Sequence, residues 1–383
     1  MHFTDHLRIK FDAKYIIVTG FAGLVPFLWL SLLDPNSGFP TTQILILYSS
    51  MIGMYVMASA LRSQSVTASG SGPMGNIITV LLLLAYIALK ANNFLNHQQS
   101  DIRSTFNYDA YHYWYGMALP IPLIYKYNEF IASKSGTAFV RIFVVTLVIC
   151  FSLLTGTRAF AIFFIMSYFA VPRRLDYSIA FLVLISFVFI AIASLLRGIS
   201  VDVLSSHIKH VLFGGQYLYT NNVQRIHESI APGWQALMTI TFPGFFVLLA
   251  TLCDAYLGTG MSYYHYESVF WWTHQFQYVP QLGVPMNSYF TPLLHAEAVG
   301  YWKYVSVLSI TAFLVGSNQS DKLRCLGISI LGYYFVCGFM YSIFNNSVFC
   351  FLLAIVVLST VLQLCLSGLT AGIRSLRSIG SAS

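Results

Sequence analysis

Charge is the property that this sequence has least of. Asp, Glu, Lys and Arg together make up 9% of its residues, whereas soluble domains carry about 25%. Hydrophobic residues make up 57% of the 383 positions, and the mean hydropathy is +0.70. Apolar runs long enough to cross a lipid bilayer recur along the chain. This composition excludes an ordinary soluble domain and predicts an all-α polytopic membrane protein that forms a single domain over residues 1–383.

Metal-binding and nucleotide-binding motifs are absent as well. The six cysteines lie in or beside apolar runs, and none has the spacing of a metal site. The sequence contains no P-loop, no H-E-x-x-H and no nucleotide-binding glycine pattern. The net charge of +7 is explained by membrane topology and gives no reason to expect nucleic acid as a partner. We therefore expect no metal and no other cofactor.

Ten apolar runs predict membrane spans, and one further segment leaves the total open. The ten runs are 15–33, 43–61, 76–91, 113–131, 139–155, 159–172, 178–196, 301–316, 325–342 and 347–366. Within residues 198–300, the stretches 234–253 and 255–276 either cross the membrane as a further pair or lie in its outer interface. The total is therefore ten or twelve spans.

Positive charge is divided unevenly between the connections. If the N-terminus is cytoplasmic, the following residues share the cytoplasmic side: Arg8, Lys10, Lys14, Arg62, Lys126, Lys134, Arg141, Arg173, Arg174, Lys322, Arg324, Arg374 and Arg377. Because cytoplasmic connections are enriched in Lys and Arg, we expect both termini in the cytoplasm. Residues 92–112 and 198–300 then form two long outer segments, and long segments between short turns usually carry function.

Two arginines lie where the charge bias does not call for them. Arg158 closes the motif T-G-T-R at residues 155–158, between two apolar runs, and Arg197 ends the next long run. A charge at the bilayer centre costs roughly 2.5–3.5 kcal/mol. Forked guanidinium donors suit phosphate oxygens, so we predict an anionic, phosphate-bearing ligand. The alternative is an arginine that anchors a helix end among headgroups; Arg103 and Arg225 either assist or are surface residues.

Candidate proton acceptors lie just before the predicted span at 301–316. His295 and Glu297 stand in this segment, and either side chain could accept a proton from a substrate hydroxyl. The alternative is that an acidic residue there only stabilises the first turn of a helix. His265, Glu267 and His274 are lower-ranked candidates in the same outer segment. We name His295 and Glu297 as the candidate catalytic bases.

Three short motifs follow one another over about residues 139–316. They are Thr155-Gly156-Thr157-Arg158, Arg197-Gly198 and Glu297-Ala298-Val299-Gly300. In this order and topology the chain resembles the Wzy-type O-antigen polymerases, bacterial enzymes that polymerise oligosaccharide repeat units. The Tyr and Phe-Gly that often follow the Glu in that family are replaced here by Ala-Val-Gly-Tyr-Trp.

The resemblance implies a C-type glycosyltransferase-like fold, related to the O-antigen ligases, in the bacterial inner membrane. It implies a metal-independent glycosyltransferase of lipopolysaccharide biosynthesis whose active site faces the periplasm. The glycan would pass from undecaprenyl pyrophosphate to a second lipid-linked unit, with a polysaccharide chain-length regulator as a candidate partner. Arg158 and Arg197 would hold the pyrophosphate, and His295 or Glu297 would activate the acceptor. Aromatic residues would stack on sugar rings: Tyr263, Tyr264, Tyr266, Trp271 and Trp272.

Other functions fit the sequence less well. An O-antigen ligase would share the donor but pass the glycan to lipid A core. A flippase or other transporter of lipid-linked oligosaccharides would need basic residues that line a cavity open to both leaflets, whereas Arg158 and Arg197 are expected at the outer end. The first outer connection, 34–38, lacks the paired acidic residues of a metal-dependent, dolichol-phosphate-type sugar transferase.

Overall fold

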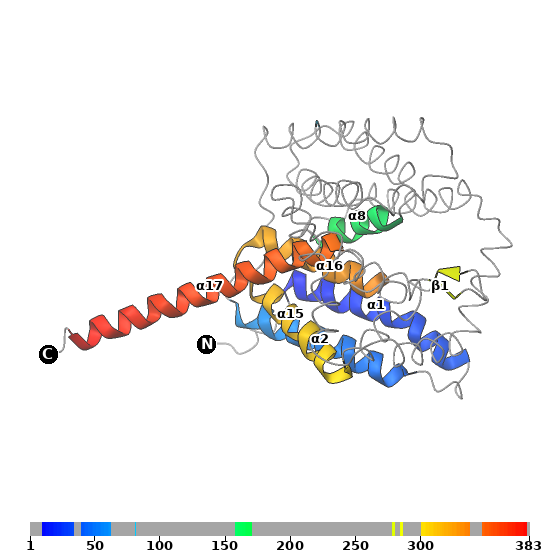
Figure 1. The fold of residues 1–383 in the computed structure, drawn as a ribbon, viewed down its shortest axis with the longest axis horizontal. Coiled ribbons are helices and arrows are strands. Elements are labelled where there is room, and N and C mark those ends of the chain that lie inside the picture. The colour runs from blue at the N-terminus through cyan, green and yellow to red at the C-terminus, as the bar shows by residue number, and fades with distance from the viewer. Residues whose placement is uncertain are drawn as a thin grey trace, which may run out of the picture.

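The computed structural model describes residues 10–33, 40–62, 81, 158–170, 278–279, 284–285, 300–337 and 347–380. Six helices account for nearly all of them: α1 (Phe11–Leu33), α2 (Thr41–Leu61), α8 (Arg158–Ala170), α15 (Tyr301–Ser317), α16 (Asp321–Cys337) and α17 (Ser347–Gly380) (Figure 1). The strands β1 (Tyr278–Val279) and β2 (Val284–Pro285) pair antiparallel, with Tyr278 opposite Pro285. This small hairpin departs from the all-helical expectation, but the described part of the fold is otherwise helical.

Three stretches within these helices are long and apolar enough to cross a membrane: Phe11–Trp29, Thr41–Leu61 and Leu352–Thr370. In α1, the side chains of Ile16, Leu24 and Phe27 are buried against neighbouring helices. Large apolar side chains such as Phe21 and Val25 remain exposed on the same helix. A helix that is apolar all round is expected where one face meets protein and the other meets lipid. The described part of the chain therefore has the character of a membrane protein.

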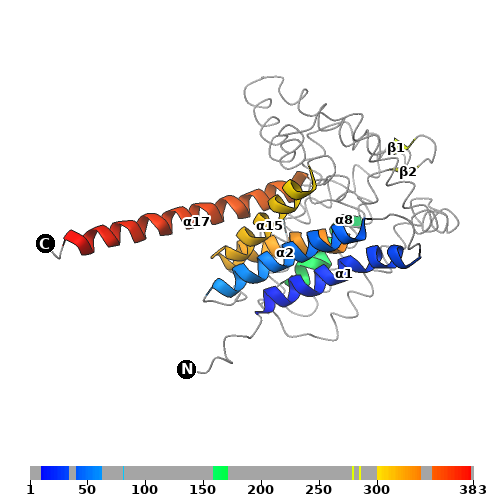
Figure 2. The same cartoon turned by 90° about the horizontal axis from the view of Figure 1, so that it is seen from below.

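Contacts at the helix ends fix the direction in which each helix runs. The Tyr301 hydroxyl donates to the carbonyl oxygen of Gln43 over 2.7 Å, so α15 and α2 begin at the same end of the bundle. Arg62 Nη1, just after α2, donates to the carbonyl of Gly316 near the end of α15 over 2.6 Å. Helices α1 and α16 run the opposite way, because Asp12 in the first turn of α1 contacts Arg62, and Arg324 in the first turn of α16 approaches Asp12. Helices α1 and α16 begin, and α2 and α15 end, at the same end of the bundle (Figure 2). We call this end, which holds Asp12, Arg62 and Arg324, the charged end, and the opposite end the far end.

Aromatic rings and close glycine contacts pack the centre of the bundle. The ring of Tyr48 on α2 lies 5.0 Å from that of Phe335 on α16 and 6.1 Å from that of Phe27 on α1. A Cβ atom placed on Gly23 would stand 2.1 Å from the carbonyl oxygen of Phe335, so only glycine allows α1 and α16 to approach this closely. The three helices are thereby held in one register.

A described helix overlaps each of the predicted spans 15–33, 43–61, 159–172, 301–316, 325–342 and 347–366. The boundaries differ most clearly at the start of α1, which begins four residues early at Phe11, at the start of α16 and at the end of α17. Helix α16 starts at Asp321, so Lys322 and Arg324, expected in a connection, lie in its first turn. It can start early because Asp321 suits a helix N-terminus and the charge of Arg324 is offset by the carboxylates of Asp12 and Asp321. Helix α17 continues past residue 366 to Gly380, since the polar residues that end the apolar run include no proline.

The remaining predicted spans lie outside the described residues. These are 76–91, except for Leu81, which is helical, together with 113–131, 139–155 and 178–196. The same holds for the outer segment 92–112 and, apart from the hairpin and Gly300, for the segment 198–300.

Candidate functional site

Of the residues predicted to bind or transform substrate, Arg158 alone falls within the described part of the chain. It is the first residue of α8. Helix α8 packs along α16 in the opposite direction: the Phe163 and Tyr333 rings are 6.4 Å apart, and Cys325 Sγ lies 4.0 Å from the carbonyl oxygen of Ala170. Because Cys325 follows Arg324, Ala170 lies at the charged end. Thirteen helical residues extend about 20 Å, which places the Arg158 backbone at the far end.

The third sequence motif reaches the same end of the bundle. Its last residue, Gly300, immediately precedes α15, and its carbonyl accepts a hydrogen bond from the backbone N–H of Tyr304 over 3.1 Å. Gly300 has φ 96°, a left-handed conformation that glycine adopts at little cost. This conformation turns the chain as it enters the helix. The structure thus brings the ends of two motifs, Arg158 and Gly300, to the far end.

The other predicted site residues lie outside the described residues. They are Arg103, Arg197, Arg225, Tyr263, Tyr264, Tyr266, Trp271, Trp272, His295 and Glu297, with the lower-ranked His265, Glu267 and His274. Within the described ranges, no three His, Cys, Asp or Glu side chains are grouped so as to hold a metal ion.

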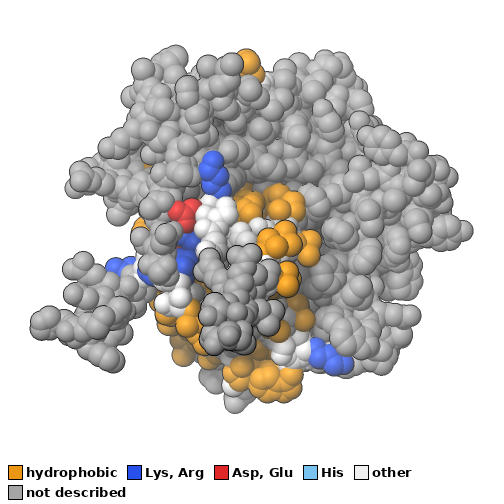
Figure 3. Space-filling view, turned by 90° about the vertical axis from the view of Figure 1, so that its left-hand side faces the viewer, with side chains coloured by type: hydrophobic (Ala, Val, Ile, Leu, Met, Phe, Trp, Pro, Cys, Tyr) orange, Lys and Arg blue, Asp and Glu red, His pale blue; other side chains and the backbone are white. Residues whose placement is uncertain are grey.

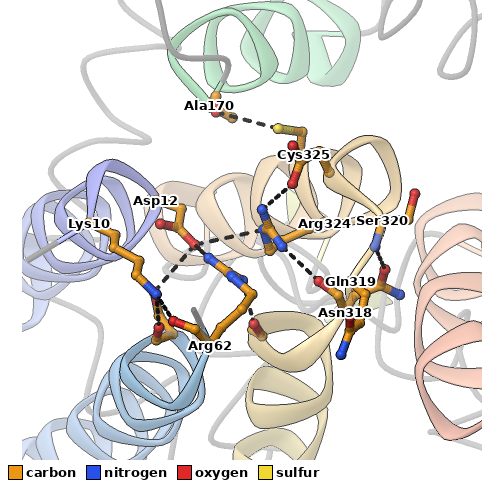
Figure 4. A network of polar contacts seen from close by, with 12 residues as sticks. Lys10, Asp12, Arg62, Ala170, Asn318, Gln319, Ser320, Arg324 and Cys325 are labelled. Carbon is orange, nitrogen blue, oxygen red and sulfur yellow. Dashed lines mark hydrogen bonds and ion pairs between the residues drawn. The ribbon is translucent and has the colours of Figure 1, made fainter. Parts of the chain in front are cut away.

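A second constellation, at the charged end, was not singled out by the sequence. We call it the Asp12 cluster: Lys10, Asp12, Arg62 and Arg324 (Figure 4). Asp12 Oδ2 accepts from Arg62 Nη2 over 2.7 Å and lies 3.9 Å from Arg324 Nε. The side chains of Asp12 and Arg324 are 0% and 1% exposed, so this carboxylate is a shared, buried counter-charge for two guanidinium groups.

Further hydrogen bonds hold Asp12 and Lys10 in the Asp12 cluster. Asp12 Oδ2 also accepts from the Tyr55 hydroxyl over 2.9 Å. Lys10 Nζ donates to the carbonyl oxygens of Ser59, over 2.7 Å, and of Arg62. Burial and the adjacent Arg62 guanidinium lower the pKa of the Lys10 ammonium, and Asp12 acts in the opposite direction. The cations of the cluster are bonded to carbonyls and to Asp12, so the cluster joins helices, while Asp12 Oδ1 is buried without a hydrogen-bond partner among the described residues.

Asn318, in the turn between α15 and α16, connects the Asp12 cluster to α17. Its carbonyl oxygen accepts from Arg324 Nη1 over 2.7 Å, and its side-chain Nδ2 donates to Thr360 Oγ1 over 2.8 Å. Its Oδ1 accepts the backbone N–H of Ser320 over 2.8 Å, which closes the turn. The sequence signal for this constellation was slight: one acidic residue between Lys10 and Lys14, with partners far along the chain.

Comparison with known proteins gives no relative: no protein-family model, curated protein or solved structure matches this chain.

Proposed function

We propose that this protein is a metal-independent glycosyltransferase that polymerises oligosaccharide repeat units linked to undecaprenyl pyrophosphate, at the periplasmic face of the bacterial inner membrane. One observation carries the proposal. Two of the three ordered motifs end in Arg158 and Gly300, and both of these residues lie at the far end of the bundle, opposite the Asp12 cluster. A phosphate-binding arginine and the segment that holds the candidate bases are therefore compatible with one site.

The proposed reaction divides its tasks between these groups. The bond between the anomeric carbon of the donor glycan and the pyrophosphate oxygen breaks, and that carbon forms a new glycosidic bond with a hydroxyl of the second lipid-linked unit. His295 or Glu297 accepts the hydroxyl proton. Arg158 and Arg197, assisted by Arg103 and Arg225, stabilise the negative charge on the departing undecaprenyl pyrophosphate. Tyr263, Tyr264, Tyr266, Trp271 and Trp272 would hold the sugar rings.

The grouping of cations at one end of the bundle supports the charge bias on which the predicted orientation rests. Lys10, Arg62 and Arg324, all expected on the cytoplasmic side, lie together at the charged end. If this end faces the cytoplasm, the far end faces the periplasm, where lipid-linked repeat units are polymerised according to the family resemblance. Both termini would then be cytoplasmic.

Reconstitution with purified lipid-linked repeat units tests the proposal. Wild-type protein should produce a ladder of polymers without any nucleotide sugar, whereas Arg158→Ala and Arg197→Ala should give none. Arg158→Lys should be strongly impaired, since an ammonium keeps the charge but loses the bidentate fork. Lys303→Gln is the matched control, because it removes an exposed cation from the same end of the bundle and should leave the ladder intact.

Three results would contradict the proposal. Normal ladders from both alanine variants would remove the arginines from the mechanism. Movement of the lipid-linked unit across the bilayer without polymer growth would indicate a flippase, and transfer only to lipid A core would indicate a ligase.

A further inference from the structure

Helix α17 extends well beyond the part of the bundle that holds it. Thr360 Oγ1 accepts from Asn318 Nδ2, and Gln363 Oε1 accepts from the backbone N–H of Gln319 over 3.0 Å. Both contacts lie at the turn between α15 and α16, at the charged end. Past Gln363 the side chains are exposed as far as Thr370, and the helix continues to Gly380 (Figures 1 and 2).

The projecting part of α17 is too apolar to stand in water. The stretch Leu352–Thr370 has a hydropathy of 2.3, the highest of the three candidate spans, yet only 22% of it is buried. Leu362, Leu366 and Leu369 are 61%, 53% and 64% exposed. Their spacing of four and three residues continues through Ile373 and Leu376, so one helical face carries a run of large apolar residues.

Charge on the same helix has one sign. Arg374 and Arg377 are its only charged residues, and no acidic residue occurs in α17 or in the rest of the chain after Asp321. By helical register, Arg377 lies about 60° and Arg374 about 120° from the centre of the apolar face, both on the same flank. An apolar face flanked by basic residues is the pattern of helices that lie in the interface of an anionic membrane.

Exposed lysines at the charged end indicate where along α17 the membrane–water interface lies. Lys14 and Lys322 are exposed there, and exposed lysine side chains favour the level of water or lipid headgroups. Figure 3 shows Lys and Arg side chains on this face, beside hydrophobic ones. A straight helix that continues past this level would carry its leucines out of the bilayer. Ser367-Gly368 offers a bending point, because kinks concentrate at Gly/Ser pairs and a Cβ on Gly368 would meet nothing within 4 Å.

We propose that residues 362–377 of α17 form an amphipathic segment that lies on the anionic lipid surface next to the charged end of the bundle. The apolar face of Leu362, Leu366, Leu369, Ile373 and Leu376 enters the headgroup region, and Arg374 and Arg377 contact lipid phosphates. This inference is independent of the catalytic proposal, since it uses none of the residues assigned to glycosyl transfer.

Hydrogen exchange of the full-length protein in nanodiscs tests this placement. Backbone amides of 362–377 should exchange more slowly in discs with phosphatidylglycerol than in discs of phosphatidylcholine alone. Arg374→Gln/Arg377→Gln should abolish that difference, because two arginines near an anionic surface change membrane affinity roughly 30-fold. Lys303→Gln, at the far end, is the control and should keep the full difference. Equal protection in both kinds of disc would overturn the proposal.

The apolar face of 362–377 could instead be covered by a second copy of the chain, and crosslinking of the native Cys365 would detect such a pair. Cys365 is exposed and lies within the same segment. Mild oxidation of discs that hold two copies should leave this thiol uncrosslinked if lipid covers the apolar face. Efficient crosslinking through Cys365, together with protection that depends on copy number and not on lipid charge, would show a helix pair and refute the lipid placement.

Discussion

Asp12 faces two guanidinium groups from inside the protein, and its position makes it costly to replace. Asp12→Asn keeps the shape of the side chain but removes the counter-charge of Arg62 and weakens that of Arg324. Removing one partner of a buried pair typically costs about 3–5 kcal/mol, because the other charge stays buried and uncompensated. We expect a clear fall in the thermal unfolding temperature, followed by helical circular dichroism in detergent.

Two variants separate this effect from a general loss of charge. Lys14→Gln changes an exposed residue on the same helix, and we expect its unfolding temperature to stay close to wild type. The double variant Asp12→Asn/Arg62→Gln should lose less stability than the sum of the two single changes, since the pair is removed together. Additive losses, or a wild-type transition for Asp12→Asn, would show that the contacts of Asp12 do not stabilise the fold.

The Asp12 cluster also shows what a sequence conceals at this scale. Charge bias correctly grouped Lys10, Arg62 and Arg324, because that bias depends only on which connections alternate along the chain. It placed Arg324 in a connection between spans, whereas the residue lies in the first turn of α16 and its side chain is 1% exposed. Its burial depends on Asp12 and on the Asn318 carbonyl. The pairing of Asp12 with Arg62 already spans 50 positions, and no local pattern encodes such a contact.

Helix–helix approach is governed by glycines that differ sharply in their surroundings. A methyl group on Gly23 of α1 would overlap the backbone of Phe335 in α16, while one on Gly53 of α2 would meet nothing within 4 Å. Gly23→Ala must therefore separate the two helices, and overpacking of this kind costs about 1–3 kcal/mol. Gly53→Ala should be neutral or stabilising by up to about 1 kcal/mol, since alanine is the better helix former.

The same chemical change at two positions makes this pair a controlled test. We expect Gly23→Ala to lower the unfolding temperature in detergent and Gly53→Ala to hold or raise it. Equal behaviour of the two variants would contradict the close packing of α1 on α16.

Helices themselves were predictable from the sequence, but their ends were less so. Apolar runs located the six described helices because length and hydropathy decide whether a segment suits a membrane. The end of α17 was missed for a different reason. Its apolar run fades near residue 366, yet the backbone of residues 367–380 remains helical, because Ser, Thr and Arg do not block helical hydrogen bonds. Hydropathy therefore predicts which part of a helix is surrounded by lipid better than it predicts where the helix ends.

Across the whole molecule, the sequence and the structure agree on the relative placement of two motifs. The sequence placed the T-G-T-R motif and the Glu297–Gly300 segment on one side of the membrane by counting alternating spans. The structure starts α8 and α15 at one end of the bundle. Which helices are neighbours could not be read from the spans, since α2 packs beside α15 through contacts about 250 positions apart in sequence.

Orientation in the membrane can be tested with two lysines that lie at opposite ends. Lys303, in the first turn of α15, and Lys322, in the first turn of α16, are both exposed. In a Cys365→Ser background, Lys303→Cys should react with a membrane-impermeant maleimide in cells whose outer membrane has been made permeable. Lys322→Cys should react only after the inner membrane is opened if, as proposed, the charged end faces the cytoplasm. The reverse pattern would place Arg158 in the cytoplasm, where it could not serve a periplasmic polymerase, while leaving the packing of the bundle intact.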